Sequence, residues 1–157
     1  MKTPRTSTGN DTDIEPYRPQ SEPKVLRPVG VRLASANDVY LALADLRAQE
    51  REHFIAFDLN VRHRIIARRI VHIGTMTSVD VHPREVFKPA ILNSAAAIIV
   101  AHNHPSGDPS PSRQDIEVTQ RLRETGSIVG IELLDHVVIA AEGYVSMAGE
   151  PYWLKTS

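Results

Sequence analysis

The pattern of hydrophobic and polar residues predicts helices and strands in alternation from about residue 35 onward. Residues 35–49, SANDVYLALADLRAQ, begin with a serine cap and carry apolar side chains at helical spacing, so we expect an amphipathic helix. Residues 53–59, HFIAFDL, place alternate side chains on opposite faces, which is the period of a β-strand. Residues 64–74, RIIARRIVHIG, are rich in residues that favour strands and predict a second strand.

The pattern continues through the second half of the chain. Residues 82–95 predict a helix with Pro83 in its first turn, and Pro89 either kinks this helix or limits it to a short turn over residues 83–87. The apolar run over 95–104 suits a central strand that is buried on both faces. The other expected elements are a short third strand or extended connection over 75–81, a helix over 112–126 ended by Gly126, two short strands within 127–141 and an edge segment over 142–147. This order predicts an α/β fold, a mixed sheet covered by helices.

Composition narrows the class of protein without specifying its chemistry. The chain has 157 residues, 41% of them hydrophobic and 24% charged, which is typical of one globular domain. Residues 1–30 hold five of the eleven prolines and few apolar side chains, so we expect a disordered tail there and a folded domain over residues 31–157. The formal net charge of −1 gives no support for tight nucleic-acid binding, and we expect no clear nucleic-acid site.

Residue types that are missing also limit the function. The chain has no cysteine, which excludes disulfides and thiolate metal sites and fits a reducing compartment. The first residues contain no apolar run like that of a secretory signal. No segment reaches the ~20 apolar residues that a bilayer-spanning helix needs. We therefore expect a soluble cytoplasmic protein with no membrane partner.

The stretch VAHNHPSGDPSPSRQD, residues 100–115, carries the candidate chemistry. Because strand side chains alternate, His102 and His104 point to the same side and Asn103 to the other. The loop that follows contains three prolines, and Asp115 then lies in the first turn of the next helix if Ser112 is the cap. Two histidines, an aspartate and an open position are typical of a catalytic zinc site. Ser112 and Asp115 are also spaced as a capping box, which helices use without any metal.

The spacing His102-x-His104, seven residues, Ser112-x-x-Asp115 resembles the JAMM signature of MPN/JAB-type metalloproteases and deubiquitinases. The words HPREVF, AHNHPSGDPSPS and LLDH are similar to the RadC family, and the likeness covers about residues 35–150. This resemblance implies a JAB/MPN (cytidine-deaminase-like) architecture and a Zn²⁺ ion held by His102, His104 and Asp115. It also implies a zinc metallopeptidase or isopeptidase that uses a metal-activated water on a peptide or protein substrate.

The resemblance further implies a glutamate general base near the start of a core strand. Glu50, Glu52 and Glu85 are the candidates, and we prefer Glu52 because it immediately precedes the strand expected at residues 53–59. Ser112 is implied to hold the oxyanion of a tetrahedral intermediate through its hydroxyl group.

Other polar residues near the motif receive structural roles. We expect Asn103 to be a partner of the proline-rich loop, and Asp135 with His136 to form a turn or a pair that supports the site. The remaining histidines are expected on strand surfaces or at turns, namely His53, His63, His72 and His82.

Two other functions fit the same residues. A metal, a water and a carboxylate also cleave phosphodiesters, so a metal-dependent nuclease or phosphodiesterase associated with DNA repair is the enzymatic alternative. The arginines within residues 62–72 could supply a basic face for it, although they fall on both sides of a strand. An inactive JAB-like scaffold that binds a partner is the alternative without catalysis. Manganese or iron could occupy the same ligands as zinc.

Overall fold

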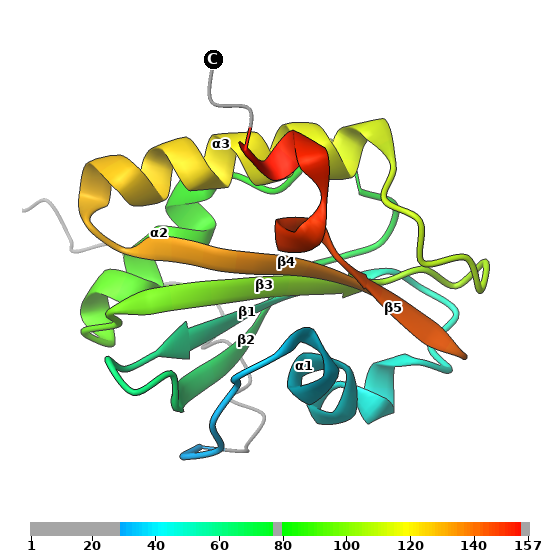
Figure 1. The fold of residues 1–157 in the computed structure, drawn as a ribbon, viewed down its shortest axis with the longest axis horizontal. Coiled ribbons are helices and arrows are strands. Elements are labelled where there is room, and N and C mark those ends of the chain that lie inside the picture. The colour runs from blue at the N-terminus through cyan, green and yellow to red at the C-terminus, as the bar shows by residue number, and fades with distance from the viewer. Residues whose placement is uncertain (1–28, 77–79, 155–157) are drawn as a thin grey trace, which may run out of the picture.

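The computed structural model describes residues 29–76 and 80–154 (Figure 1). The tail expected over residues 1–30 lies outside the described residues, apart from its last two positions. Residues 77–79, in the middle of the segment expected to be a third strand or an extended connection, lie outside them as well. The described residues on either side, 75–76 and 80–81, are not in a strand.

The described residues form a five-stranded mixed sheet in the order β2-β1-β3-β4-β5. The strands are β1 (His53–Leu59), β2 (Ile65–Ile73), β3 (Ala97–Asn103), β4 (Glu132–Ala140) and β5 (Gly143–Ser146). Strands β3 and β4 run parallel, and the other three neighbouring pairs are antiparallel. Every residue of β3 is buried, as the apolar run predicted. The predicted α/β fold with a mixed sheet is confirmed.

Helices cover both faces of this sheet (Figure 1). Helix α1 (Ala36–Ala42) lies on one face, whereas α2 (Pro83–Leu92) and α3 (Arg113–Val129) lie on the other. Each face has its own hydrophobic core, and β1 contributes side chains to both. Phe54 lies in the core under α2 and α3, and Ile55 lies in the core under α1. Short 3₁₀ helices, η1 (Ala44–Leu46), η2 (Met147–Gly149) and η3 (Pro151–Leu154), complete the described chain. No helix among the described residues is long and apolar enough to cross a membrane.

Three expected boundaries were wrong. Helix α1 ends at Ala42, and the rest of the helix expected over 35–49 is replaced by the 3₁₀ turn η1. Residues 127–129 continue α3 instead of starting a strand. The two short strands expected within 127–141 are therefore one strand, β4.

Pro89 does not limit α2 to a short turn, because the helix continues to Leu92. Proline lacks the N–H that would bond the carbonyl of Glu85, four residues earlier. The guanidinium of Arg69 donates to that carbonyl at 3.4 Å and to the carbonyl of Val86 at 2.8 Å. Arg69 is itself buried and held by Asp58, with 2.6 Å between nitrogen and oxygen. A side chain from the sheet thus replaces the hydrogen bond that the proline removes.

Gly126 does not end α3, contrary to the expectation. The helix runs on to Val129, and Gly130 ends it with a left-handed φ of 75°. Gly126 is needed because the chain folds back tightly after the helix. A Cβ at this position would lie 2.5 Å from the carbonyl oxygen of Ile131, closer than real Cβ atoms come. The glycine therefore marks a close approach of backbone to backbone.

We expect Gly126→Ala to lower the free energy of unfolding by about 1–3 kcal/mol, the usual cost of forcing volume into a packed site. This loss should occur even though alanine is the better helix former. Gly143→Ala is the matched control, because a Cβ at Gly143 meets nothing within 4 Å. Urea unfolding of both variants measures the difference. A Gly126→Ala protein as stable as the control would show that the close approach relaxes without cost.

Candidate metal centre

Two elements bring the three expected ligands together. His102 lies near the end of β3 and His104 just beyond it, and Asp115 lies in the first turn of α3. The two histidine Nε2 atoms are 2.9 Å apart. Asp115 places Oδ1 at 3.2 Å from Nε2 of His102 and Oδ2 at 3.5 Å from Nε2 of His104. The three ligand atoms lie within 4.8 Å of one another, so this cluster could hold one metal ion.

The capping box and the metal cluster are formed by the same carboxylate. Ser112 is the N-cap of α3, and its Oγ accepts a hydrogen bond from the Asp115 amide at 3.2 Å. In return, Oδ2 of Asp115 accepts from the Ser112 amide at 2.6 Å. These two bonds fix the orientation of the Asp115 side chain before any metal arrives. The sequence offered the cap and the metal ligand as alternatives, and the structure satisfies both geometries at once.

Proton positions test whether this cluster fits a cation. Nδ1 of His104 lies 2.8 Å from the carbonyl oxygen of Asp108, which can only accept, so the ring proton belongs on Nδ1. In the neutral ring, Nε2 is then a bare lone pair facing Nε2 of His102 and the Asp115 carboxylate. Three electron-rich atoms in mutual contact repel one another unless a positive charge lies between them. The donor set therefore fits a divalent cation.

The shifted pKa values of His104 and Asp115 also indicate that this cluster favours a positive charge. Hydrogen bonding to Asp115 raises the pKa of His104 above its usual value, although burial opposes the shift. Burial alone would raise the pKa of Asp115, but its contacts with the His102 and His104 rings outweigh burial and hold that pKa well below its usual range. Asp115 is therefore an ionised ligand at any physiological pH. In the metal-free protein, a proton on His104 can take the place of the cation.

Glu52 lies beside the ligand cluster but outside it. Its main-chain carbonyl accepts from Gly74 at 2.9 Å, and its Oε2 accepts from the Met76 amide at 3.1 Å. Strand β1 runs antiparallel to β3 with Phe54 opposite His102, so continuing this register brings Glu52 level with His104. The negative charge of Glu52 also contributes to the raised pKa of His104. The Glu52 carboxylate thus interacts electrostatically with His104 and is not one of the three converging residues.

The other two glutamate candidates lie elsewhere. Glu50 is exposed in the segment between η1 and β1. Glu85 is exposed in the first turn of α2, where it pairs with Arg84. Neither is among the main causes of the shifted pKa values of His104 and Asp115.

Asn103 faces away from the ligands, as expected, but its partner is not the proline-rich loop. Its Oδ1 accepts from the His53 amide at 2.7 Å, and its Nδ2 donates to the Arg51 carbonyl at 3.0 Å. These contacts hold the segment that carries Glu52. The residue between the two histidines therefore secures the position of the neighbouring glutamate.

Asp135 and His136 were expected to form a turn or a pair that supports the site. The turn is wrong because both residues lie in β4, and the supporting contact is made by His136 but not by Asp135. The position of His136 shows this contact. His136 lies inside β4, fully buried, with Nε2 at 2.8 Å from Nδ1 of His102. Its Nδ1 lies 2.6 Å from Oγ1 of Thr119 on α3. Asp135 instead accepts hydrogen bonds from Ser146 and the amide of Ala148. Burial lowers the pKa of His136 well below its usual value, so the ring is neutral. The signal that pointed to it is a histidine inside an apolar strand, where a polar side chain needs a partner.

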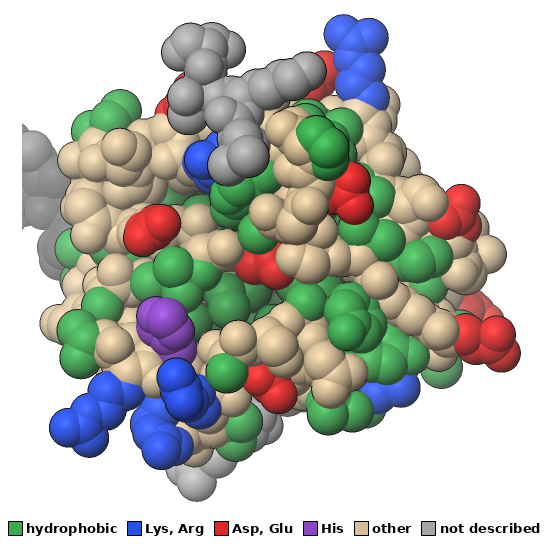
Figure 2. Space-filling model, viewed as in Figure 1, with side chains coloured by type: hydrophobic (Ala, Val, Ile, Leu, Met, Phe, Trp, Pro, Cys, Tyr) green, Lys and Arg blue, Asp and Glu red, His purple; other side chains and the backbone are tan. Residues whose placement is uncertain are grey.

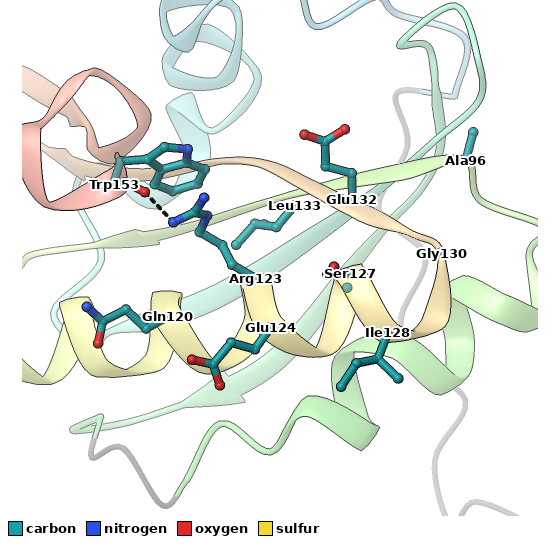
Figure 3. A pocket seen from close by; sticks show the side chains of 11 residues that line it. Ala96, Gln120, Arg123, Glu124, Ser127, Ile128, Gly130, Glu132, Leu133 and Trp153 are labelled. Atoms are coloured by element: carbon teal, nitrogen blue, oxygen red, sulfur yellow. Dashed lines mark hydrogen bonds between the residues drawn. The ribbon is translucent and has the colours of Figure 1, made fainter. Parts of the chain in front are cut away.

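A separate hollow of about 890 Å³ lies along the C-terminal half of α3 (Figure 3). Arg123 donates to the carbonyl oxygen of Trp153, and its guanidinium carbon lies 4.6 Å from the Trp153 ring centre. The side chains of Gln120, Glu124 and Glu132 point in different directions and do not converge (Figure 3). None of the metal ligands lines this hollow. We therefore place the candidate chemistry at the histidine–aspartate cluster.

Comparison with known proteins matches the part of the chain that forms the sheet and its helices. Residues 33–152 match the family described as the RadC-like JAB domain. The chain is 53% identical over 110 residues to a UPF0758 protein of Bacillus licheniformis, covering 70% of this chain and 49% of that protein. It is 53% identical over 112 residues to UPF0758 protein YsxA of Bacillus subtilis, covering 71% and 48%. A UPF0758 protein of Shouchella clausii is 47% identical over 131 residues, covering 83% and 56%. The chain thus spans about half the length of these curated relatives.

Proposed function

This chain belongs to the RadC family of JAB-like domains, and from that premise we propose that it is a zinc-dependent hydrolase of peptide or isopeptide bonds. One observation carries the proposal: His102, His104 and an ionised Asp115 converge on one point, with the Glu52 carboxylate beside them. Three protein ligands leave a coordination position open, as catalytic zinc sites do. The chain spans about half the length of its curated relatives. The substrate class is therefore proposed from the site and is not taken from those proteins.

Each neighbouring side chain has one task in this proposal. A zinc ion held at the cluster supplies a Lewis acid that lowers the pKa of water and polarises the scissile carbonyl. Glu52 accepts the proton of the attacking water and returns it to the leaving amine. The Met76 amide donates to the Glu52 carboxylate and holds it in place, and the Gly74 amide donates to the main-chain carbonyl of Glu52.

The proposal assigns to Ser112 the stabilisation of negative charge on the substrate. Its Oγ uses a lone pair to accept the Asp115 amide in the cap, so that bond does not consume its hydroxyl proton. The hydroxyl can therefore donate to a developing oxyanion. Ser112 also stands at the N-terminus of the 17-residue helix α3, whose dipole favours negative charge there.

The arginines of residues 62–72 do not supply a basic face beside the cluster for a nucleic acid. Of the four arginines in residues 62–72, Arg68 and Arg69 are buried and paired with Asp45 and Asp58. Arg62 and Arg64 are exposed at the hairpin between β1 and β2. Blue Lys and Arg side chains gather at the lower left of Figure 2, away from the centre of this face. This hairpin follows Leu59, which pairs with Ala97 at the end of β3 remote from His102. The basic side chains thus lie away from the proposed reaction site.

The test compares bond classes on one protein preparation. The zinc-loaded chain is incubated with a peptide library, with isopeptide-linked peptides and with single- and double-stranded DNA oligonucleotides. We expect cleavage of peptide or isopeptide bonds that a chelator abolishes and added zinc restores. Chelator-sensitive DNA cleavage would support the phosphodiesterase alternative. Tight zinc binding with no cleavage of either class would support the scaffold.

A further inference from the structure

We infer that Thr119 and His136 are positioning residues that fix the proton and the ring orientation of His102, so that its Nε2 is held bare for a metal. The inference deepens the proposed function and rests on the cluster of His102, His104 and Asp115 as the metal centre. The contacts run from the main chain of Asp115 through Thr119 and His136 to the ring of His102.

Each hydrogen bond in this series of contacts requires one proton. Oγ1 of Thr119 lies 2.6 Å from the carbonyl oxygen of Asp115, which can only accept, so the hydroxyl proton lies in that contact. Oγ1 also lies 2.6 Å from Nδ1 of His136. The hydroxyl has no second proton, so Nδ1 of His136 must donate. A more distant contact from Oγ1 to the sulfur of Met147, at 3.5 Å, does not compete for that proton.

The same counting continues to the metal centre. His136 is fully buried, and its ring nitrogens bond His102 and Thr119 rather than a carboxylate of the described residues, so a second proton would leave an unpaired buried charge. With its one proton on Nδ1, Nε2 of His136 accepts. The 2.8 Å contact between that atom and Nδ1 of His102 therefore contains the His102 proton. Nε2 of His102 is left as a lone pair, and it faces Nε2 of His104 and the Asp115 carboxylate.

Packing prevents these rings from taking another orientation. The Phe54 ring stacks on His102 with ring centres 6.1 Å apart, and it meets His136 edge-on at 5.4 Å. Thr119, His102 and His136 are all buried. The chain of contacts joins α3, β4 and β3, and it returns to Asp115, whose side chain is itself a ligand. Helix α3, which carries Asp115, thus also determines through Thr119 and His136 which nitrogen of His102 holds the proton.

The first experiment reads the proton positions directly in the metal-free protein. Two-bond ¹H–¹⁵N correlation spectra distinguish a histidine protonated on Nδ1 from one protonated on Nε2. The His136→Phe variant identifies the His136 signals by their loss, and His104→Ala separates the remaining ligand signals. We expect the Nδ1–H form for both His136 and His102 at mildly alkaline pH. An Nε2–H form of either ring would overturn the inference.

The second experiment uses matched variants of Thr119. Thr119→Val removes the hydroxyl that accepts from His136, whereas Thr119→Ser keeps it. Residues that orient metal-binding histidines typically change metal affinity by about 10–100-fold, so we expect Thr119→Val to weaken zinc binding by that factor. Thr119→Ser should stay within a few-fold of the unmodified protein. Competition with a chromogenic chelator measures zinc affinity, and thermal unfolding reports whether each variant is folded.

The outcomes separate this inference from the proposed function. Zinc affinity that is equal in folded Thr119→Val and Thr119→Ser would overturn the positioning role, even if the chain hydrolyses peptides. The expected proton positions and affinities in a protein without hydrolytic activity would uphold the positioning role and count against the hydrolase. If Thr119→Val does not fold, the spectra of the unmodified protein still decide the inference.

Discussion

Zinc should be lost from the His104→Ala protein, whereas the unmodified protein should retain about one equivalent per chain after dialysis. Removing His104 leaves two of the three converging ligand atoms. We expect the same loss for His102→Ala and for Asp115→Asn, which removes the ionised oxygen but keeps the side-chain shape. Elemental analysis measures retained zinc, and chelator competition measures the affinity.

Folding has to be separated from metal binding in this experiment. Zinc that binds only the folded state stabilises it by about 4 kcal/mol at a thousandfold excess over Kd, so added zinc should raise the melting temperature of the unmodified protein. It should leave that of His104→Ala almost unchanged. His82→Ala is the matched control, because His82 lies outside the cluster and its side chain makes no capping hydrogen bond. Full zinc content in folded His104→Ala would refute the ligand assignment.

Glu52→Gln should keep its zinc and lose turnover by about 10²–10⁴-fold, the usual contribution of a general base. Glutamine preserves the shape of the side chain and can still accept the Met76 amide, which bonds Oε2 of Glu52 at 3.1 Å. It cannot take a proton from water at neutral pH. Steady-state hydrolysis of the best peptide or isopeptide substrate, with zinc content determined in the same samples, measures the effect.

Glu85→Gln is the control for a surface carboxylate. Glu85 is exposed in the first turn of α2, where a negative charge is worth only about 0.3–1 kcal/mol to its helix. Its turnover should stay within a few-fold of the unmodified protein. If Glu85→Gln is inactive and Glu52→Gln is active, the assignment of the general base to Glu52 is wrong, and the base lies on α2. Loss of zinc from Glu52→Gln would instead make Glu52 a ligand.

Tertiary contacts explain the unexpected roles of Gly126 and Pro89. Glycine commonly ends a helix, so the sequence predicted a helix end at Gly126. The structure shows that a glycine is required inside α3 because the Ile131 carbonyl oxygen packs against this position. Pro89 was expected to kink α2 or to limit it to a short turn. The helix continues to Leu92, and Arg69 reaches across from β2 to the Glu85 carbonyl that the proline leaves without its helical partner. In both cases the deciding partner comes from another element.

The sequence by itself identified the three residues of the candidate metal cluster and the kind of fold. Strand alternation places His102 and His104 on one side, and a capping box places Asp115 in the first turn of α3; both effects act over a few residues. Tertiary structure alone decided which groups surround these ligands. Glu52 comes beside His104 through the pairing of β1 with β3, and His136 reaches His102 because β4 lies parallel to β3. The contact between these two histidines spans 34 residues of chain. Such pairings form because the sheet buries apolar side chains along its whole length, and no local pattern encodes which polar residues it brings together.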